Sequence, residues 1–226
     1  MINDVLLMAL LAGSMTILGG LPFFFLAVSH RLRDNLLGFS AGMMVTAAFS
    51  LISEAHNYWL MVAGMGIGAL LLSLLIRFFP EGGRLAWLSF IAISLHNIPE
   101  GLVVGVGYAE EATLGLLMAV TIGIQNMPEG LMIVAPLLEQ GINRWNAFFF
   151  LACAALVEPV FAVSGYVLVA QVNELLPLAL GFAAGSMLYV TFRELIPETH
   201  GHGYEGQATF SFLFGVVLML GLGQLF

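Results

Sequence analysis

Two short polar motifs lie inside long apolar runs of this 226-residue chain. Residues 96–101 read His-Asn-Ile-Pro-Glu-Gly, and residues 125–130 read Gln-Asn-Met-Pro-Glu-Gly. A carboxylate at hydrocarbon depth costs roughly 3 kcal/mol or more, so such residues usually have a function. Because each glutamate directly follows a helix-disrupting proline, the repeated motif indicates a binding site within a membrane.

The spacing within the motifs favours a site for a divalent metal ion. On a helix, His96 and Glu100 are four residues apart and share a face, as Gln125 and Glu129 do. Two such helices facing each other would present the side chains of His96, Asn97, Glu100, Gln125, Asn126 and Glu129. Imidazole, carboxylate and amide ligands suit zinc, iron(II), manganese or cobalt. The plainer alternative is that these groups only hydrogen bond to one another and hold the helices together.

Other residues extend the candidate site. Glu158 precedes Pro159 in a later apolar run, and it joins the same site or holds a second ion beside the first. Met44 would line the path with thioether sulfur or would simply pack. The residues that could receive an ion at the cytoplasmic end are Glu194, Glu198, His200 and His202.

The composition places the elements that carry these residues in a bilayer. The chain is 60% hydrophobic and 9% charged, with a mean hydropathy of +1.00. Eight apolar runs approach the roughly 20 residues that a spanning helix needs, and they lack the alternation of β-barrel strands. The predicted spans are 5–28, 36–53, 59–79, 86–108, 112–138, 147–170, 175–192 and 208–226. We therefore predict an all-α membrane protein in which residues 1–226 form a single polytopic domain.

The arginines predict the orientation. All six basic residues are arginine, and every one lies at a connector or span end on the same predicted face. These are Arg31, Arg33, Arg77, Arg84, Arg144 and Arg193. The positive-inside rule makes that face cytoplasmic and places both termini outside. We expect the protein to lie in a plasma (inner) membrane. Acidic residues on the opposite face, such as Glu54 and Glu110, would attract cations.

The chain also repeats itself. Residues 38–44, Gly-Phe-Ser-Ala-Gly-Met-Met, match residues 181–187, Gly-Phe-Ala-Ala-Gly-Ser-Met. The copies fall in the second and seventh spans, which run antiparallel, so spans one to three and six to eight form an inverted repeat. The two kinked motif helices lie between them, which leaves the spans in a 3+2+3 order. An inverted repeat around interrupted central helices is typical of secondary transporters. The alternative is that Gly-x-x-x-Gly patterns recur wherever membrane helices pack closely.

The two motifs resemble the paired signatures of the ZIP (Zrt/Irt-like protein) metal transporters, in the form of the prokaryotic GufA-type branch. The resemblance implies uptake of zinc, and also of iron, manganese, cobalt or cadmium, as transported ions without a prosthetic group. It implies a primary site of His96, Glu100 and Glu129 near a second-span methionine, and a cytoplasmic exit position at Glu194. It also implies an adjacent second site formed by Asn97, Glu100, Asn126, Glu129 and Glu158.

The resemblance further implies a homodimer and an elevator-type cycle in which spans one, four, five and six slide against the other four. Two features depart from many relatives: Gln125 and Asn126 replace a histidine and an acidic residue, which should weaken the second ion. A long histidine-rich loop is also absent, since only residues 80–85 lie between spans three and four.

A metal or proton channel remains an alternative. An intramembrane metalloenzyme is a further alternative, but this chain lacks the His-Glu-x-x-His signature. Nothing in the sequence predicts nucleic-acid binding.

Overall fold

The computed structural model describes residues 1–26, 28–77 and 86–225, with the side chains of residues 86–93 and 173 left out. The described residues are helical and include no strand. Seven helical stretches among them are long and apolar enough to cross a membrane. A further 25-residue helix, α4, carries the first polar motif. The predicted all-helical class is confirmed.

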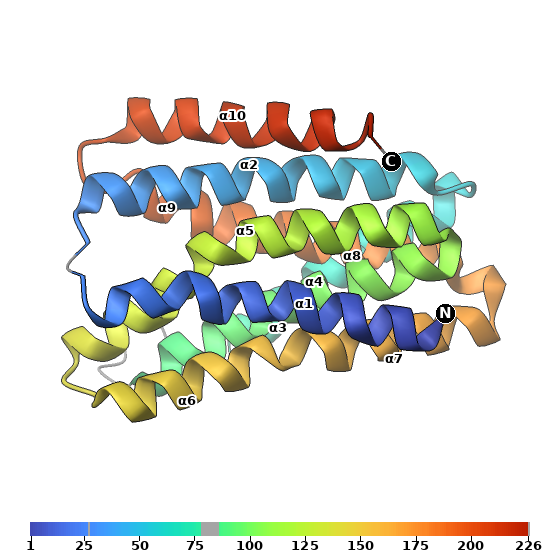
Figure 1. Cartoon of the computed structure of the whole chain (residues 1–226). Coiled ribbons are helices and arrows are strands. Elements are labelled where there is room, and N and C mark those ends of the chain that lie inside the picture. Colours follow the sequence, from blue (N-terminus) through green and yellow to red (C-terminus); the bar gives the residue numbers. More distant parts are fainter. Residues whose placement is uncertain (27, 78–85, 226) are drawn as a thin grey trace.

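The helices run along a common direction, and the two termini lie at the same end of the molecule (Figure 1). The first half contains α1 Ile2–Gly20, η1 Leu21–Phe24, α2 His30–Glu54, α3 Tyr58–Arg77, α4 Ala86–Glu110 and α5 Ala112–Glu139. The second half contains α6 Arg144–Ala155, α7 Val157–Gln171, η2 Asn173–Leu175, α8 Leu176–Val190, η3 Thr191–Leu195, α9 Ile196–Glu198 and α10 Glu205–Leu222.

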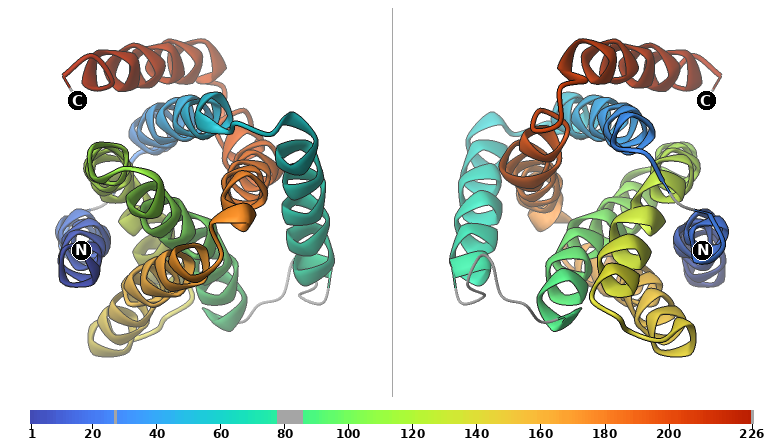
Figure 2. Two further views of the ribbon diagram at one scale, coloured as in Figure 1. Left: turned by 90° about the vertical axis from the view of Figure 1, so that its right-hand side faces the viewer. Right: turned by 90° about the vertical axis from the view of Figure 1, so that its left-hand side faces the viewer.

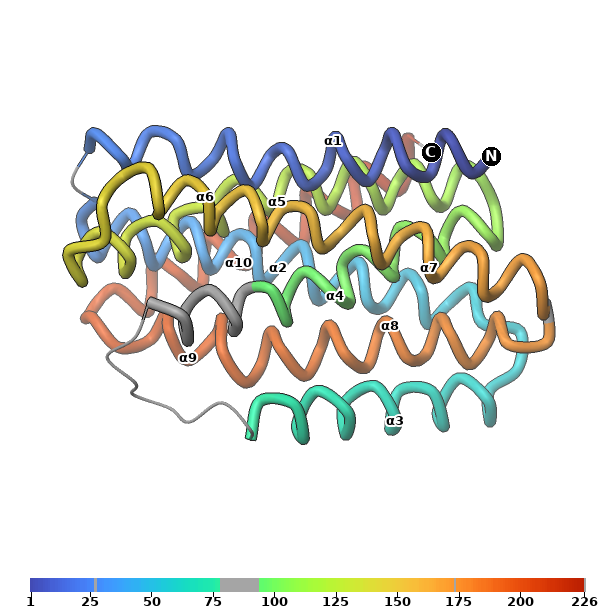
Figure 3. The backbone as a smooth tube through the Cα atoms, turned by 90° about the horizontal axis from the view of Figure 1, so that it is seen from below, coloured from blue at the N-terminus to red at the C-terminus, as the bar shows by residue number. Residues whose placement is uncertain are grey.

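Each predicted span overlaps one of these helical runs, but the bounds differ most at the second and the seventh. α2 begins at His30 instead of residue 36, and the seventh run ends later than predicted. There the helical run continues through Glu198 instead of ending near residue 192, because the π-helical turn η3 joins α8 directly to α9. The predicted connector at residues 80–85, with Arg84, lies outside the described residues. α6 and α7 follow one another as one run (Figure 3).

The helices pack in two matched sets of pairs. α10 lies against α2, and α3 lies against α8 (Figure 2). In the same way α1 lies against α5, and α7 lies against α4. Contacts between α2 and α5 and between α4 and α8 then join the two sets. The motif helices α4 and α5 therefore lie side by side, each between a partner in its own set and a helix of the other.

Glycines set the closest approaches in one of these sets. Gly38 and Gly42 place α2 directly against the backbone of α10, where an added Cβ would collide with carbonyl oxygens. Gly181 and Gly185 place α8 against the backbone of α3 in the same manner. These are the glycines of the two repeated seven-residue segments, and in each copy they serve the same kind of contact.

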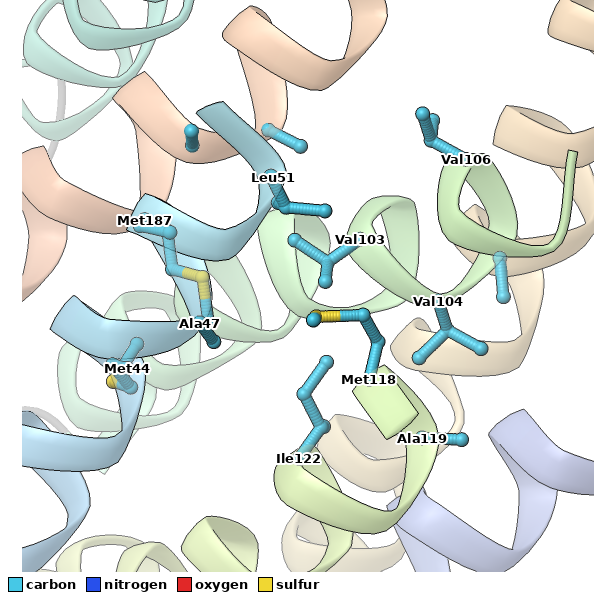
Figure 4. Close-up of a cluster of buried hydrophobic side chains, with 14 of the residues drawn as sticks. Met44, Ala47, Leu51, Val103, Val104, Val106, Met118, Ala119, Ile122 and Met187 are labelled. Atoms are coloured by element: carbon cyan, nitrogen blue, oxygen red, sulfur yellow. The ribbon is translucent and has the colours of Figure 1, made fainter. Parts of the chain in front are cut away.

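A buried apolar cluster occupies the centre of the bundle on the terminal side of the motifs (Figure 4). It contains Met44, Ala47 and Leu51 from α2, Val103 and Val104 from α4, Met118 and Ile122 from α5, and Met187 from α8. These side chains come from both sets of helices. The boundary between the sets is therefore apolar at the level of this cluster and polar at the level of the motifs.

Candidate metal centre

Four helix interruptions surround the polar motifs. Pro99 lies within α4 and Pro128 within α5. Each proline lacks an N–H and leaves the carbonyl four residues earlier without its helical donor. The helix ends between α6 and α7 at Leu156, two residues before Glu158, and η3 is π-helical around Glu194. π-helical turns are frequent at functional sites because they re-aim side chains.

The Glu100 carboxylate is held by the neighbouring motif helix. Gln125 Nε2 donates a hydrogen bond to Glu100 Oε1 at 2.8 Å, and both residues are fully buried. Glu100 Oε2 and Gln125 Oε1 have no hydrogen-bond partner within the described residues. The amide of Gln125 is thus turned with its nitrogen toward the carboxylate, which leaves one oxygen of each side chain available.

Glu158 joins the motifs through Asn126. Asn126 Nδ2 donates to Glu158 Oε1 at 2.7 Å and to the Ala12 carbonyl of α1 at 3.1 Å. Asn126 Oδ1 and Glu158 Oε2 also lack a hydrogen-bond partner in the part of the chain described. The break at Leu156 lets α7 begin beside α4, so Glu158 enters the centre from the first turn of a helix.

Glu129 is held by a residue that the motifs did not indicate. The Ser40 hydroxyl of α2 donates to Glu129 Oε1 at 2.6 Å, with both residues buried. Ser40 belongs to the first copy of the repeated segment, where the second copy has Ala183. The polar difference at this position was the available sequence signal, although the copies also differ at Met43 and Ser186.

His96 and Asn97 contact different elements. His96 Nδ1 lies 3.5 Å from Glu194 Oε2, which places Glu194 directly beside His96. Asn97 Nδ2 donates to the Ala154 carbonyl at 2.8 Å, at the end of α6. His96 and Asn97 are buried, whereas Glu194 is 26% exposed. Glu194 is therefore the more exposed member of this pair.

Met44 lies on the other side, within the apolar cluster. The Thr191 hydroxyl donates to the Met187 carbonyl at 2.8 Å and lies 3.6 Å from Met44 Sδ. The methionine side chain is fully buried. Met44 therefore lies at the apolar boundary of the candidate metal centre.

Three carboxylates and several amides thus converge at one place. Glu100, Glu129 and Glu158 lie close enough for their charges to interact. Within the described residues 1–26, 28–77 and 86–225, no group of three or more His, Cys, Asp or Glu side chains is arranged to coordinate a metal ion by itself. A metal ion here would therefore need amide oxygens as well, and buried acceptors without donors are what a cation satisfies.

Two of the residues expected at the far end contact the start of α2. Glu198 pairs with Arg33 at 2.6 Å, and His202 Nδ1 lies 3.0 Å from Asp34 Oδ1. The ring of His30 stacks on His202 with 4.5 Å between centroids. His200 Nδ1 instead lies 2.9 Å from the Ile196 carbonyl of its own helical turn. Sequence reasoning missed His30 and Asp34, because nothing local indicates that α2 begins beside this segment.

The comparisons with known proteins find similarity to zinc transporters. The sequence model of a family described as "ZIP Zinc transporter" matches residues 80–223. Zinc transporter GufA of Myxococcus xanthus is 36% identical, over 95% of this chain and 96% of its own. Zinc transporter ZIPB of Bordetella bronchiseptica is 35% identical, over 86% of this chain and 72% of its own. Zinc transporter ZupT of Clostridium perfringens is 30% identical, over 96% and 95% respectively.

Proposed function

Because the chain belongs to the ZIP family of zinc transporters, a multi-pass membrane transporter family and not an enzyme family, we propose that it moves zinc into the cytoplasm through the centre at Glu100 and Glu129. Iron(II), manganese, cobalt and cadmium are the other candidate ions, since the ligand types suit divalent metals generally. The observation that carries this proposal is the set of buried oxygens around Glu100 without hydrogen-bond donors.

The first ion is bound by His96, Glu100 and Glu129. These three residues match the primary site implied by the two motifs. Gln125 orients the Glu100 carboxylate and Ser40 orients the Glu129 carboxylate, each through one hydrogen bond. A second ion would lie toward Asn97, Asn126 and Glu158. The Asn126–Glu158 hydrogen bond supports a shared location, although an asparagine contributes no charge there.

Zinc leaves the centre past Glu194 toward the arginine-bearing face. The apolar cluster at Leu51, Val103 and Met118 closes the terminal side, while Glu194 is partly exposed on the opposite side. By the positive-inside rule, the start of α2, with Arg31 and Arg33, lies in the cytoplasm. The arrangement described is then an inward-facing one, with both termini outside and the protein in the plasma membrane.

An elevator-type movement fits the packing. α4 serves as an eighth span, and the matched pairs α2–α10 and α8–α3 support the inverted repeat and the 3+2+3 arrangement. The set formed by α1, α4, α5 and α6–α7 carries the ligands His96, Glu100, Glu129 and Glu158. It meets the other set largely through apolar side chains, which can slide without breaking many hydrogen bonds. A homodimer formed through the other set, α2, α3, α8 and α10, would keep that set fixed.

Reconstitution tests the proposal directly. Purified protein in liposomes loaded with a zinc-sensitive dye should give zinc entry that saturates as external zinc rises, because a carrier turns over through a bound state. Protein-free liposomes provide the baseline. A flux that never saturates would favour a channel, and peptide cleavage without zinc entry would contradict transport altogether.

Zinc binding should weaken as the solution is acidified from about pH 7.5 to about pH 5.5, because zinc binds only a neutral imidazole and ionised carboxylates and must displace their protons. Calorimetry on the purified protein should show the apparent dissociation constant rising at least about tenfold over this interval. An affinity that stays flat would remove His96 from the ligand set.

A further inference from the structure

One hydrogen bond of the metal centre comes from outside the helices that supply its ligands. The Ser40 hydroxyl donates to Glu129 Oε1 at 2.6 Å between α2 and α5. α2 packs mainly against α10 and α8, whereas α5 packs mainly against α1 and α4. The bond therefore crosses the boundary between the two sets of helices at the level of the metal ligands.

The repeat supplies an internal comparison for this bond. Ser40 corresponds to Ala183 in the second copy, and Glu129 corresponds to Glu100 in the other motif. α8 packs against α4 as α2 packs against α5, so the second copy has the same helix contact without a hydroxyl. Glu100 accepts its hydrogen bond from Gln125 instead. Among the described residues, Glu129 is thus the one of the two glutamates that accepts a hydrogen bond from the opposite set.

We propose that Ser40 is a positioning residue for Glu129 in zinc binding. A charge-assisted hydrogen bond to one carboxylate oxygen fixes the plane of the group and leaves acceptor capacity for a metal ion. Partners of this kind orient metal ligands, and their loss typically lowers metal affinity about 10–100-fold. The inference rests on the proposed function, since it concerns how one proposed ligand is held.

The full-length purified protein carrying Ser40→Ala tests the proposal. Calorimetric titration with zinc should show affinity about tenfold weaker than that of the unsubstituted protein. Alanine already occupies the corresponding position at Ala183, so the helix contact tolerates it. The matched control is Ser186→Ala: Ser186 is a buried serine of α8 whose hydroxyl has no hydrogen-bond partner in the described structure. Its removal should leave zinc affinity unchanged.

Infrared spectroscopy provides a readout that general loosening would not produce. The carboxylate stretching band of Glu129, identified by its loss in Glu129→Gln, should shift in Ser40→Ala and stay in place in Ser186→Ala. Wild-type affinity in Ser40→Ala, combined with lost binding in Glu129→Ala, would overturn the role of Ser40 and leave the metal centre intact. Undiminished binding in Glu129→Ala would overturn the centre itself and the role of Ser40 with it.

Discussion

Replacing Glu100 with alanine should abolish zinc uptake into liposomes. Glu100 is fully buried between α4, α5 and α7, and its Oε2 has no hydrogen-bond partner among the described residues. Loss of a residue that merely orients a ligand lowers metal affinity about 10–100-fold, so loss of a charged ligand should cost more than that. Zinc binding by calorimetry and dye-reported zinc entry should fall together, because one carboxylate serves both.

The matched control for this prediction is Glu110→Ala. Glu110 ends the same helix, is partly exposed, and lies 3.5 Å from His56 at the terminal side of the bundle. Its loss should leave zinc binding near that of the unsubstituted protein. In Glu100→Ala the Gln125 amide loses its acceptor, which costs about 1–3 kcal/mol, so thermal unfolding must show that the variant is folded. A folded Glu100→Ala protein that still transports zinc would place the ion elsewhere.

Replacing Asn126 with aspartate should destabilise the metal-free protein and create a firm second ion site. Asn126 Nδ2 donates to Glu158 Oε1 at 2.7 Å and to the Ala12 carbonyl at 3.1 Å. An ionised aspartate has no N–H to donate and would face both oxygens with a negative charge. A broken buried hydrogen bond together with an added like charge should cost about 3 kcal/mol of unfolding free energy. A divalent ion between Asp and Glu158 would reverse that repulsion.

Two measurements together check this prediction. The melting temperature of Asn126→Asp should be below that of the unsubstituted protein without zinc and should rise more strongly with zinc, because ligands that bind only the folded state stabilise it. Calorimetry should give one additional zinc per chain. The control Asn143→Asp changes the exposed N-cap of α6, where aspartate caps equally well, and should behave like the unsubstituted protein. An unchanged number of zinc ions bound per chain in Asn126→Asp would contradict the second ion site.

Much of the fold could be read from the sequence because a bilayer imposes a simple rule. Spanning segments must be helical and apolar over about 20 residues, so the spans could be bounded from hydrophobicity alone. His96, Glu100, Gln125 and Glu129 could be singled out for the converse reason, since polar groups at that depth are expensive. The helix ends were less predictable where a helical run continues through polar residues, as at Glu198, where a π-helical turn carries the seventh span onward.

The sequence by itself determined the membrane class, the two motif helices and the residue types of the candidate centre, because those depend on local spacing and on the cost of burying charge. The tertiary structure alone decided the partners: Ser40 against Glu129 and His202 against Asp34 join residues 89 and 168 positions apart. It likewise turned the Gln125 nitrogen toward Glu100 and brought Glu194 beside His96. Helical periodicity fixes which face a side chain lies on, but the helix that meets that face depends on how the whole bundle packs.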